Sequence, residues 1–321
     1  MRVVSAVLLL GLVAPALTTP DCRPGCNRPS GANFTAFLDL LQPSNQFFQR
    51  AAFHDCGDGS IFDGTGGADG SLQFETGRTV NAGLAPTVNF LASTAHSMGV
   101  SVADTIVLAA TLSVVRCGGP NIKFFPGRID AKSAGPDGRI PVPTDSEGFL
   151  QSDLGRRMSM TFAEQTSFIT GSHTIGCVHG ADQPQLTKKS CAPFDTTSTV
   201  FDNQIFKELV AGTSKDLLGT DQRMLSDPVY QSSIQQWAAS QSAFFGEYTT
   251  AFGKLDHDAD RQHAGAEAQR GSLGGAPIGA FDVRRGLGAL RHPEPRGNAL
   301  QRRARLHREM LPQDRNLGQG G

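Results

Sequence analysis

The sequence predicts a mainly α-helical protein, because apolar residues recur at helical spacing in several segments, one segment opens with a capping box, and strand-like alternation is scarce. The 321 residues, 39% hydrophobic and 18% charged, are enough for a sizeable core and exclude a wholly disordered or fibrous chain. The formal net charge of −1 argues against a nucleic-acid binder that works by general basicity. We therefore expect no nucleic-acid partner.

Residues 1–19 are predicted to be a secretory signal peptide. The chain starts with a positive charge and continues as an apolar run to Leu17, with small residues at Ala14 and Ala16. The alternative, a membrane anchor, is disfavoured because the run is too short to span a bilayer comfortably. We therefore expect a secreted protein without a membrane partner.

Export has two further consequences for the sequence. Asn33, in Asn33-Phe34-Thr35, becomes a usable glycosylation site. The six cysteines are expected to form disulfides, in one of 15 connectivities that the sequence leaves open. They are Cys22, Cys26, Cys56, Cys117, Cys177 and Cys191.

The helices are expected in the following order. Helical spacing of apolar residues runs over 34–41, 102–114, 201–209 and, as one long helix, 230–252. Between them, Thr161-Phe-Ala-Glu164 is a capping box that opens a helix expected to continue to His173. Gly118-Gly119-Pro120 ends the helix over 102–114.

The composition changes after Leu255. Residues 256–321 hold eleven Arg, no Lys and eight acids, a balance of 11 − 8 = +3, and no sustained apolar period. This Arg-rich tail is predicted to be mostly disordered. A basic tail suits polyanions, but a merely solvated tail explains the composition equally well, so we assign it no chemistry.

One group of residues points to chemistry near residue 54. On a helix, Arg50 and His54 lie one turn apart with Phe53 beside them, so all three address one site. Asp55 is rotated by about 100° and faces elsewhere. Together with Asp69 and Ser71 of the following glycine-rich loop, it offers the oxygen ligands that calcium prefers.

A second group repeats this logic around His173. Thr174 is turned away from His173, and the segment 194–202 offers oxygens at Asp195, Thr197 and Asp202. Taken singly, a helix histidine is usually packed or solvated, and a glycine-rich loop is usually a turn. Two such histidine-and-oxygen pairs in one chain argue against coincidence.

Seven motifs together carry a family resemblance. They are Arg50-x-x-Phe53-His54-Asp55, Gly67-Ala-Asp69-Gly-Ser71, Val80-Asn81-Ala-Gly-Leu84, Val102-Ala-Asp104, Gly127-Arg-Ile-Asp-Ala131, Gly171-Ser-His173-Thr174-Ile-Gly176, and Pro193-Phe194-Asp195 to Asp202. With them the chain resembles the secreted haem peroxidases of the plant and fungal superfamily, most of all the fungal ligninolytic-type (class II-like) group. The resemblance implies a fold of about ten helices, with one haem b held between a distal half (20–145) and a proximal half (146–255).

The resemblance assigns roles on the distal side of the haem. His54 is the base that takes a proton from peroxide and returns it to the leaving oxygen. Asn81 accepts a hydrogen bond from His54 and keeps it basic, and Arg50 supplies a fixed positive charge. Phe53 stands where the intracellular class has Trp.

On the proximal side, the resemblance makes His173 the iron ligand. Asp227 matches the residue that accepts from the other nitrogen of His173. The alternative for Asp227 is a helix N-cap ahead of Pro228. Phe194 again stands where the intracellular class has Trp.

The resemblance also implies two calcium sites and one donor contact. The distal ligands are Asp55, Gly67, Asp69 and Ser71. The proximal ligands are Thr174, Asp195, Thr197, Val200 and Asp202. Pro141 corresponds to a proline whose carbonyl meets aromatic donors at the haem edge.

Several positions depart from specialised relatives. Manganese-oxidising members have acids where this chain has Pro43, Phe47 and His179. Members that use a surface Trp have it where this chain has Phe168, and the single Trp237 lies on an apolar helix stripe, so we expect it in the core.

These observations predict a secreted, monomeric haem peroxidase that reduces hydrogen peroxide and oxidises small phenol-like donors at the haem edge by one-electron steps. It would have neither a manganese site nor a surface-Trp relay. Two other classes remain as alternatives. One is a catalytically silent haem- or calcium-binding protein, which leaves Arg50, His54 and Asn81 unexplained. The other is a zinc hydrolase that uses His173, His179 and Asp55, which leaves both calcium loops unexplained.

Overall fold

A computed structural model of the chain describes residues 46–142, 150–181, 183–214, 217–254 and 281–282. The signal peptide, Asn33, Pro43 and the helix expected over 34–41 lie outside the described residues. The described part is mainly helical, which confirms the predicted fold class. Its α-helices are α2 (Gln46–Cys56), α3 (Ala85–Met98), α4 (Val102–Arg116), α6 (Phe162–Ser172), α7 (Gln204–Ala211), α8 (Gly219–Ser226), α9 (Pro228–Ala239) and a helix over 241–254. Shorter helical segments are the 3₁₀ helices η1 (Ser71–Phe74) and η2 (Thr79–Asn81) and the π-helix η3 (Leu150–Gly155).

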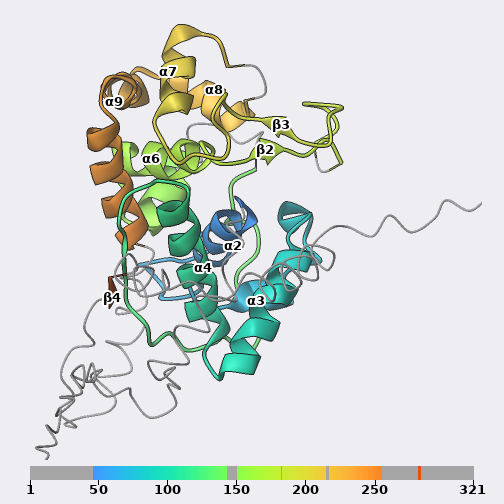
Figure 1. Cartoon of the computed structure of the whole chain (residues 1–321). Coiled ribbons are helices and arrows are strands. Elements are labelled where there is room, and N and C mark those ends of the chain that lie inside the picture. Colours follow the sequence, from blue (N-terminus) through green and yellow to red (C-terminus); the bar gives the residue numbers. More distant parts are fainter. Residues whose placement is uncertain (1–45, 143–149, 182, 215–216, 255–280, 283–321) are drawn as a thin grey trace, which may run out of the picture.

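The helices form two groups. In Figure 1, α2, α3 and α4 (blue to green) lie on one side of α6, and α7, α8 and α9 (yellow to orange) lie on the other. α4 packs against both α2 and α3, and α9 packs against α6, α7 and α8. α2, which carries His54, belongs to the first group. α6, which ends next to His173, packs against the helices of the second group.

Side-chain caps start both α4 and α6, and the cap of α6 is the predicted one. Ser101 caps α4 by accepting a hydrogen bond from the Asp104 N–H (3.1 Å). The capping box of α6 is complete: the Thr161 side chain accepts from the Glu164 N–H, and the Glu164 carboxylate accepts from the Thr161 N–H. α6 ends at Ser172, so that His173 occupies its C-cap.

The prediction of one long helix over 230–252 is wrong. The structure has two helices there, α9 and the helix over 241–254, which are separated at Ser240. Ser240 has an extended backbone, and its hydroxyl accepts a hydrogen bond from the Ala243 N–H (3.3 Å), so it starts the second helix. The helix expected over 201–209 begins later, at Gln204, whose N–H donates to the Asp202 carboxylate (2.9 Å).

Four two-residue strands pair among the described residues. β1 (Lys123–Phe124) pairs antiparallel with β4 (Phe281–Asp282), which belongs to the Arg-rich tail. β2 (Cys177–Val178) pairs antiparallel with β3 (Ala192–Pro193), next to a disulfide between Cys177 and Cys191. The rest of the tail lies outside the described residues, so its predicted disorder stays a prediction.

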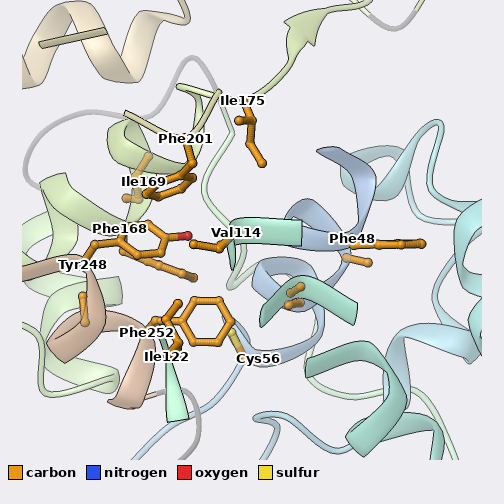
Figure 2. Packing of buried hydrophobic residues seen from close by; sticks show 14 of the residues in the cluster. Phe48, Cys56, Val114, Ile122, Phe168, Ile169, Ile175, Phe201, Tyr248 and Phe252 are labelled. Carbon is orange, nitrogen blue, oxygen red and sulfur yellow. The ribbon is translucent and has the colours of Figure 1, made fainter. Parts of the chain in front are cut away.

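Aromatic side chains dominate the core between α6, α7 and the helix over 241–254. Phe201 lies 4.8 Å from Tyr248 and 5.5 Å from Phe244, measured between ring centroids. Figure 2 shows Phe168, Phe201, Tyr248 and Phe252 packed together. Such pairs are worth about 0.5–1.5 kcal/mol beyond their burial.

Trp237 is buried and packs on Phe206, as its place on an apolar stripe predicts. Tyr230 and Tyr248 are buried as well. Within the described ranges, no single helix is both long and apolar enough to cross a membrane. Only α3 and α4 together have that length and composition, and they are bent by 114° at the break between them.

Candidate active site

A cavity of about 470 Å³ lies between α2 and α6. Three histidines line it: His54 from α2, His173 from the end of α6, and His179 at one edge. Its other walls are largely apolar. The predicted residues Arg50, Phe53, Pro141 and Phe194 all line this cavity, together with Phe168. The structure thus brings together residues that are up to 144 positions apart in the sequence.

The hydrogen bonds around His54 determine which nitrogen carries the proton. Asn81 Nδ2 donates to the Glu75 carbonyl (3.0 Å), so Asn81 Oδ1 faces His54 Nδ1 at 2.7 Å. Because this oxygen only accepts, His54 Nδ1 carries the proton. His54 Nε2 is therefore the basic nitrogen, and Arg50 Nε donates to it at 3.4 Å.

Arg50 is held in place by the same short segment that holds His54. Its two terminal nitrogens donate to the carbonyls of Ala82 (2.7 Å) and Val80 (3.1 Å), on either side of Asn81. The guanidinium therefore has a fixed position beside His54. The spacing of Arg50 and His54 by one helical turn, which the sequence predicted, is confirmed by α2.

Burial and charge keep His54 neutral. Burial lowers the pKa of His54, and the nearby Arg50 charge lowers it further, to about 3, against the partial opposition of the hydrogen bond to Asn81. The imidazole is therefore uncharged at neutral pH. An uncharged imidazole beside a fixed cation can accept a proton from a bound molecule in the cavity.

His173 faces the cavity from the opposite wall. Its Nδ1 lies 3.0 Å and 3.2 Å from the two carboxylate oxygens of Asp221, which is fully buried at the start of α8. Thr170 also donates to Asp221 (2.7 Å) and so fixes its orientation. The ring of His173 stacks on Phe194 at 4.5 Å. Since Asp221 accepts at Nδ1, the lone pair of His173 lies on Nε2, which has no hydrogen-bond partner among the described residues.

The prediction that Asp227 accepts from His173 is wrong. The Asp227 carboxylate accepts instead from the Val229 N–H (2.9 Å) and caps α9, which is the alternative that the following Pro228 suggested. The two aspartates lie at opposite ends of the short helix α8: Asp221 meets Thr170 of α6, whereas Asp227 caps the next helix. Sequence reasoning missed Asp221, although an acid in the first turn of a helix was visible in the sequence.

The predicted distal calcium ligands lie at the end of α2, in the loop that follows it and at the start of η1. The Asp55 carboxylate accepts from the N–H groups of Gly70 (3.0 Å) and Leu72 (3.1 Å), facing away from His54 as predicted. Asp69 accepts from the Ser71 N–H (3.0 Å), and its own N–H donates to the Gly67 carbonyl (2.7 Å). The four predicted residues are therefore neighbours in space.

A further carboxylate, Asp58, joins this loop and was not singled out from the sequence. Its Oδ1 accepts from the Gly67 N–H at 2.8 Å. Burial raises the pKa of Asp58 to about 7, and the charges of Glu75 and Asp69 raise it too. Burial and the charges of Asp69 and Asp58 also raise the pKa of Asp55. The loop thus concentrates negative charge in a buried place.

The predicted proximal calcium ligands converge in the same way after α6. Thr174 Oγ1 lies 2.9 Å from Asp195 Oδ2 and 3.3 Å from Asp202 Oδ1, and Thr197 Oγ1 lies 3.1 Å from Asp202 Oδ1. Val200 follows in the same turn, its N–H bonded to the Thr197 carbonyl (2.7 Å). Burial and the charges of Asp202 and Glu208 raise the pKa of Asp195 to about 6.

No group of three or more His, Cys, Asp or Glu side chains within the described ranges is placed to bind a metal ion. Both loops combine carboxylates with hydroxyl and carbonyl oxygens, which suit calcium rather than zinc. The zinc alternative fails on this geometry. Asp55 faces its loop instead of His173, and the ring of His179 stacks on Phe47.

One edge of the cavity is formed by the stacked rings of Phe47 and His179, whose centroids are 5.1 Å apart. These are two of the three positions at which manganese-oxidising relatives have acids. Phe168, which corresponds to a surface Trp in other relatives, is buried here and packs edge-on against Phe53 (5.5 Å).

Comparisons with known proteins agree with this geometry. The model of the peroxidase family matches residues 33–240, more than half of the chain. Cytosolic L-ascorbate peroxidase 1 of Oryza sativa subsp. japonica is 31% identical over 211 residues, which cover 64% of this chain and 82% of that protein. Peroxisomal L-ascorbate peroxidase 5 of Arabidopsis thaliana is 35% identical over 211 residues, covering 64% and 73%. A protein of Cryptococcus neoformans provisionally named a heme-binding peroxidase is 32% identical over 220 residues, covering 64% and 67%.

Proposed function

This chain belongs to the peroxidase family, and we propose that within it the protein is a secreted enzyme that oxidises small phenol-like donors at the haem edge. Family membership makes it a haem-dependent oxidoreductase that acts on hydrogen peroxide. The observation that carries the proposal is the cavity with a hydrogen-bonded imidazole on each of two opposite walls. In the proposed reaction, peroxide takes up two electrons and two protons and becomes two waters, while two phenols lose one electron and one proton each.

The cavity fits a haem. Its walls are apolar, and His173 presents an unprotonated Nε2 to it, held by the Asp221 carboxylate on the other side of the ring. When bound, the haem supplies an iron that accepts the oxidising equivalents of peroxide and passes them on singly. His173 is then the residue that would bind this iron, and Phe194 supports its ring from one face.

His54 and Arg50 would handle the protons and the charge of peroxide. His54 Nε2 would take a proton from one oxygen of the peroxide and deliver it to the other oxygen, which leaves as water. Arg50, fixed by the Val80 and Ala82 carbonyls, stabilises the negative charge that develops as the oxygen–oxygen bond breaks. Asn81 holds His54 in the tautomer that this transfer needs.

The side chains at the edge of the cavity support a small phenol-like donor. Phe47 and His179 present rings there in place of carboxylates, and manganese(II) prefers oxygen ligands. Trp237, Tyr230 and Tyr248 are buried in the core, which disfavours a surface relay through any of them. Pro141 lies on the cavity wall, where its carbonyl would meet a donor hydroxyl. We expect the protein to act as a monomer.

Secretion is supported by the apolar start of the chain and by the Cys177–Cys191 disulfide, since disulfides persist mainly in oxidising compartments. The two ascorbate peroxidases described above are named as a cytosolic and a peroxisomal enzyme. Export of this chain therefore belongs to the proposal. Its direct test is recovery of the protein, cleaved near residue 19, from culture medium.

Steady-state kinetics with three donors test the substrate class. At one peroxide concentration we expect saturable turnover of a small phenol and no saturable oxidation of manganese(II). The third donor is ascorbate, which appears in the names of two of the relatives. Ascorbate turnover well above phenol turnover would contradict the proposed donor class. As a matched gain-of-function control, the double variant Phe47→Glu with His179→Asp places two carboxylates on stacked neighbours and should acquire manganese oxidation.

We also propose that each haem-bearing helix is tied to its neighbouring loop by a calcium ion. The distal loop would use Asp55, Gly67, Asp69 and Ser71. The proximal loop would use Thr174, Asp195, Thr197, Val200 and Asp202. The crowding of carboxylates in both loops supports this, because a bound cation would relieve their mutual repulsion.

Chelation of calcium should lower the melting temperature. A ligand present at 100 times its dissociation constant stabilises the native state by about 2.7 kcal/mol, and chelation removes that stabilisation. Asp195→Ala should reduce the calcium content by about one ion per chain, whereas Asp137→Asn, at a mostly exposed carboxylate, should not change it. Equal calcium content in Asp195→Ala and the unmodified protein would contradict the proximal site.

A further inference from the structure

We propose that Asp58 is a ligand of the cation in the loop after α2, with Ser71 beside it and Glu75 at the border of the site. Asp58 lies outside the ligand set that the family resemblance implies. The inference rests on the calcium binding proposed above, and it assigns a residue that neither the sequence nor the comparisons single out. Its test measures bound calcium, so it does not depend on peroxidase turnover.

Three side-chain oxygens converge beside Gly135. A Cβ atom on Gly135 would lie 2.1 Å from Asp58 Oδ2 and 3.1 Å from both Ser71 Oγ and Glu75 Oε1, so the backbone of Gly135 packs closely against them. The three oxygens come from the start of the loop after α2, from η1 and from the residue after η1. Glu75 Oε1 accepts from the Gly135 N–H (2.7 Å), which leaves the oxygens of Asp58 and Ser71 to bind a hard cation.

Two of these oxygens lack a partner. Asp58 is 1% exposed and Ser71 is fully buried, and neither Asp58 Oδ2 nor Ser71 Oγ has a hydrogen-bond partner among the described residues. Leaving such groups unsatisfied is costly, so native structures usually provide a partner, a water or an ion. The other oxygen of Asp58 accepts from the Gly67 N–H, and Oδ2 then lies against Gly135.

The charge around these oxygens is unbalanced. Asp55, Asp58 and Asp69 form no ion pair with a described residue, while Arg78 pairs with Glu75 (2.8 Å) and Asp137 (3.7 Å). Arg139 pairs with Asp63 (2.9 Å), and its bond to Asp58 goes to the main-chain carbonyl. A divalent cation beside Asp58 would restore the balance. Calcium fits this donor set, because it takes carboxylate and hydroxyl oxygens together.

Gly135 supplies the sharpest test, since it holds none of the proposed ligands through its side chain. Gly135→Ala keeps Asp58, Ser71 and Glu75 but presses a methyl group against their oxygens. Loss of calcium in Gly135→Ala would therefore report on the convergence of these oxygens.

The experiment uses the full-length haem-loaded protein and four variants, Asp58→Asn, Ser71→Ala, Gly135→Ala and the control Asp63→Asn. Calcium per chain is measured by elemental analysis, and calcium chloride is titrated calorimetrically into chelator-treated protein. Asp58→Asn and Gly135→Ala should each lose about one calcium and part of the calcium-dependent rise in melting temperature. Asp63→Asn, at an exposed carboxylate of the same loop, should keep both.

The same calcium stoichiometry and affinity in Asp58→Asn and in the unmodified protein would overturn the inference. If Asp58→Asn does not fold, Gly135→Ala decides it by the same measure. Peroxide turnover is recorded in parallel. A chain without turnover that still loses one calcium on Asp58→Asn supports the inference and refutes the proposed function, whereas normal turnover with unchanged calcium does the reverse.

Discussion

His54→Leu should slow the reaction of this enzyme with hydrogen peroxide by about 10²–10⁴-fold while leaving haem bound. The variant removes the imidazole beside Arg50, and with it both the acceptance and the return of the peroxide proton. Haem retention is expected because His173 lies on the other wall. Stopped-flow absorption of the haem after mixing with peroxide measures the rate.

Arg50→Leu is the matched comparison for His54→Leu. Arg50 contributes charge but moves no proton, so its loss should slow the same step by a smaller factor. Asn81→Leu should have an intermediate effect, because His54 would lose the partner that sets its tautomer. A rate for His54→Leu equal to that of the unmodified enzyme would refute its role as base.

Asp221→Asn and Asp227→Asn should have opposite signatures. Removal of the Asp221 charge next to His173 should raise the reduction potential of the bound iron, because a negative charge stabilises the more oxidised metal. Asp227→Asn should leave that potential unchanged, and as asparagine also caps helices well it should keep most of the stability. Asp227→Ala, which removes the cap of α9, should cost about 1 kcal/mol in the free energy of unfolding.

The two measurements are a spectroelectrochemical titration of the haem and chemical denaturation. A shift of the potential in Asp227→Asn together with none in Asp221→Asn would reverse the assignment made here. The pair is informative because both side chains carry the same charge and lie at the two ends of α8. Only their contacts differ.

Much of the helical framework was predictable, because the signals that start helices act over a few residues. The capping box at Thr161 and Glu164 and the serine cap of α4 lie next to the groups that they bond. The facing of Arg50 and His54 follows from helix geometry alone. The break at Ser240 was missed because apolar spacing continues across it, and only a single side-chain cap interrupts the helix.

The partners of the functional residues depended on tertiary packing. Whether Asp221 or Asp227 meets His173 is decided by the packing of α8 against α6, where Thr170 holds Asp221 in place. Asn81 was assigned by resemblance, and its bond to His54 requires that a segment 27 residues away close over α2. Asp58 gains its significance only where Gly135, 77 positions later, approaches it.

The sequence by itself thus determined the fold class, the helices that bear His54 and His173, and the families of oxygen ligands around them, because these follow from spacing within one element or loop. The tertiary structure decided which carboxylate faces His173, where the long helix breaks, and which side-chain oxygens converge beside Gly135. These are distances between elements. They are set by the packing of side chains across the core, which no local pattern of the chain encodes.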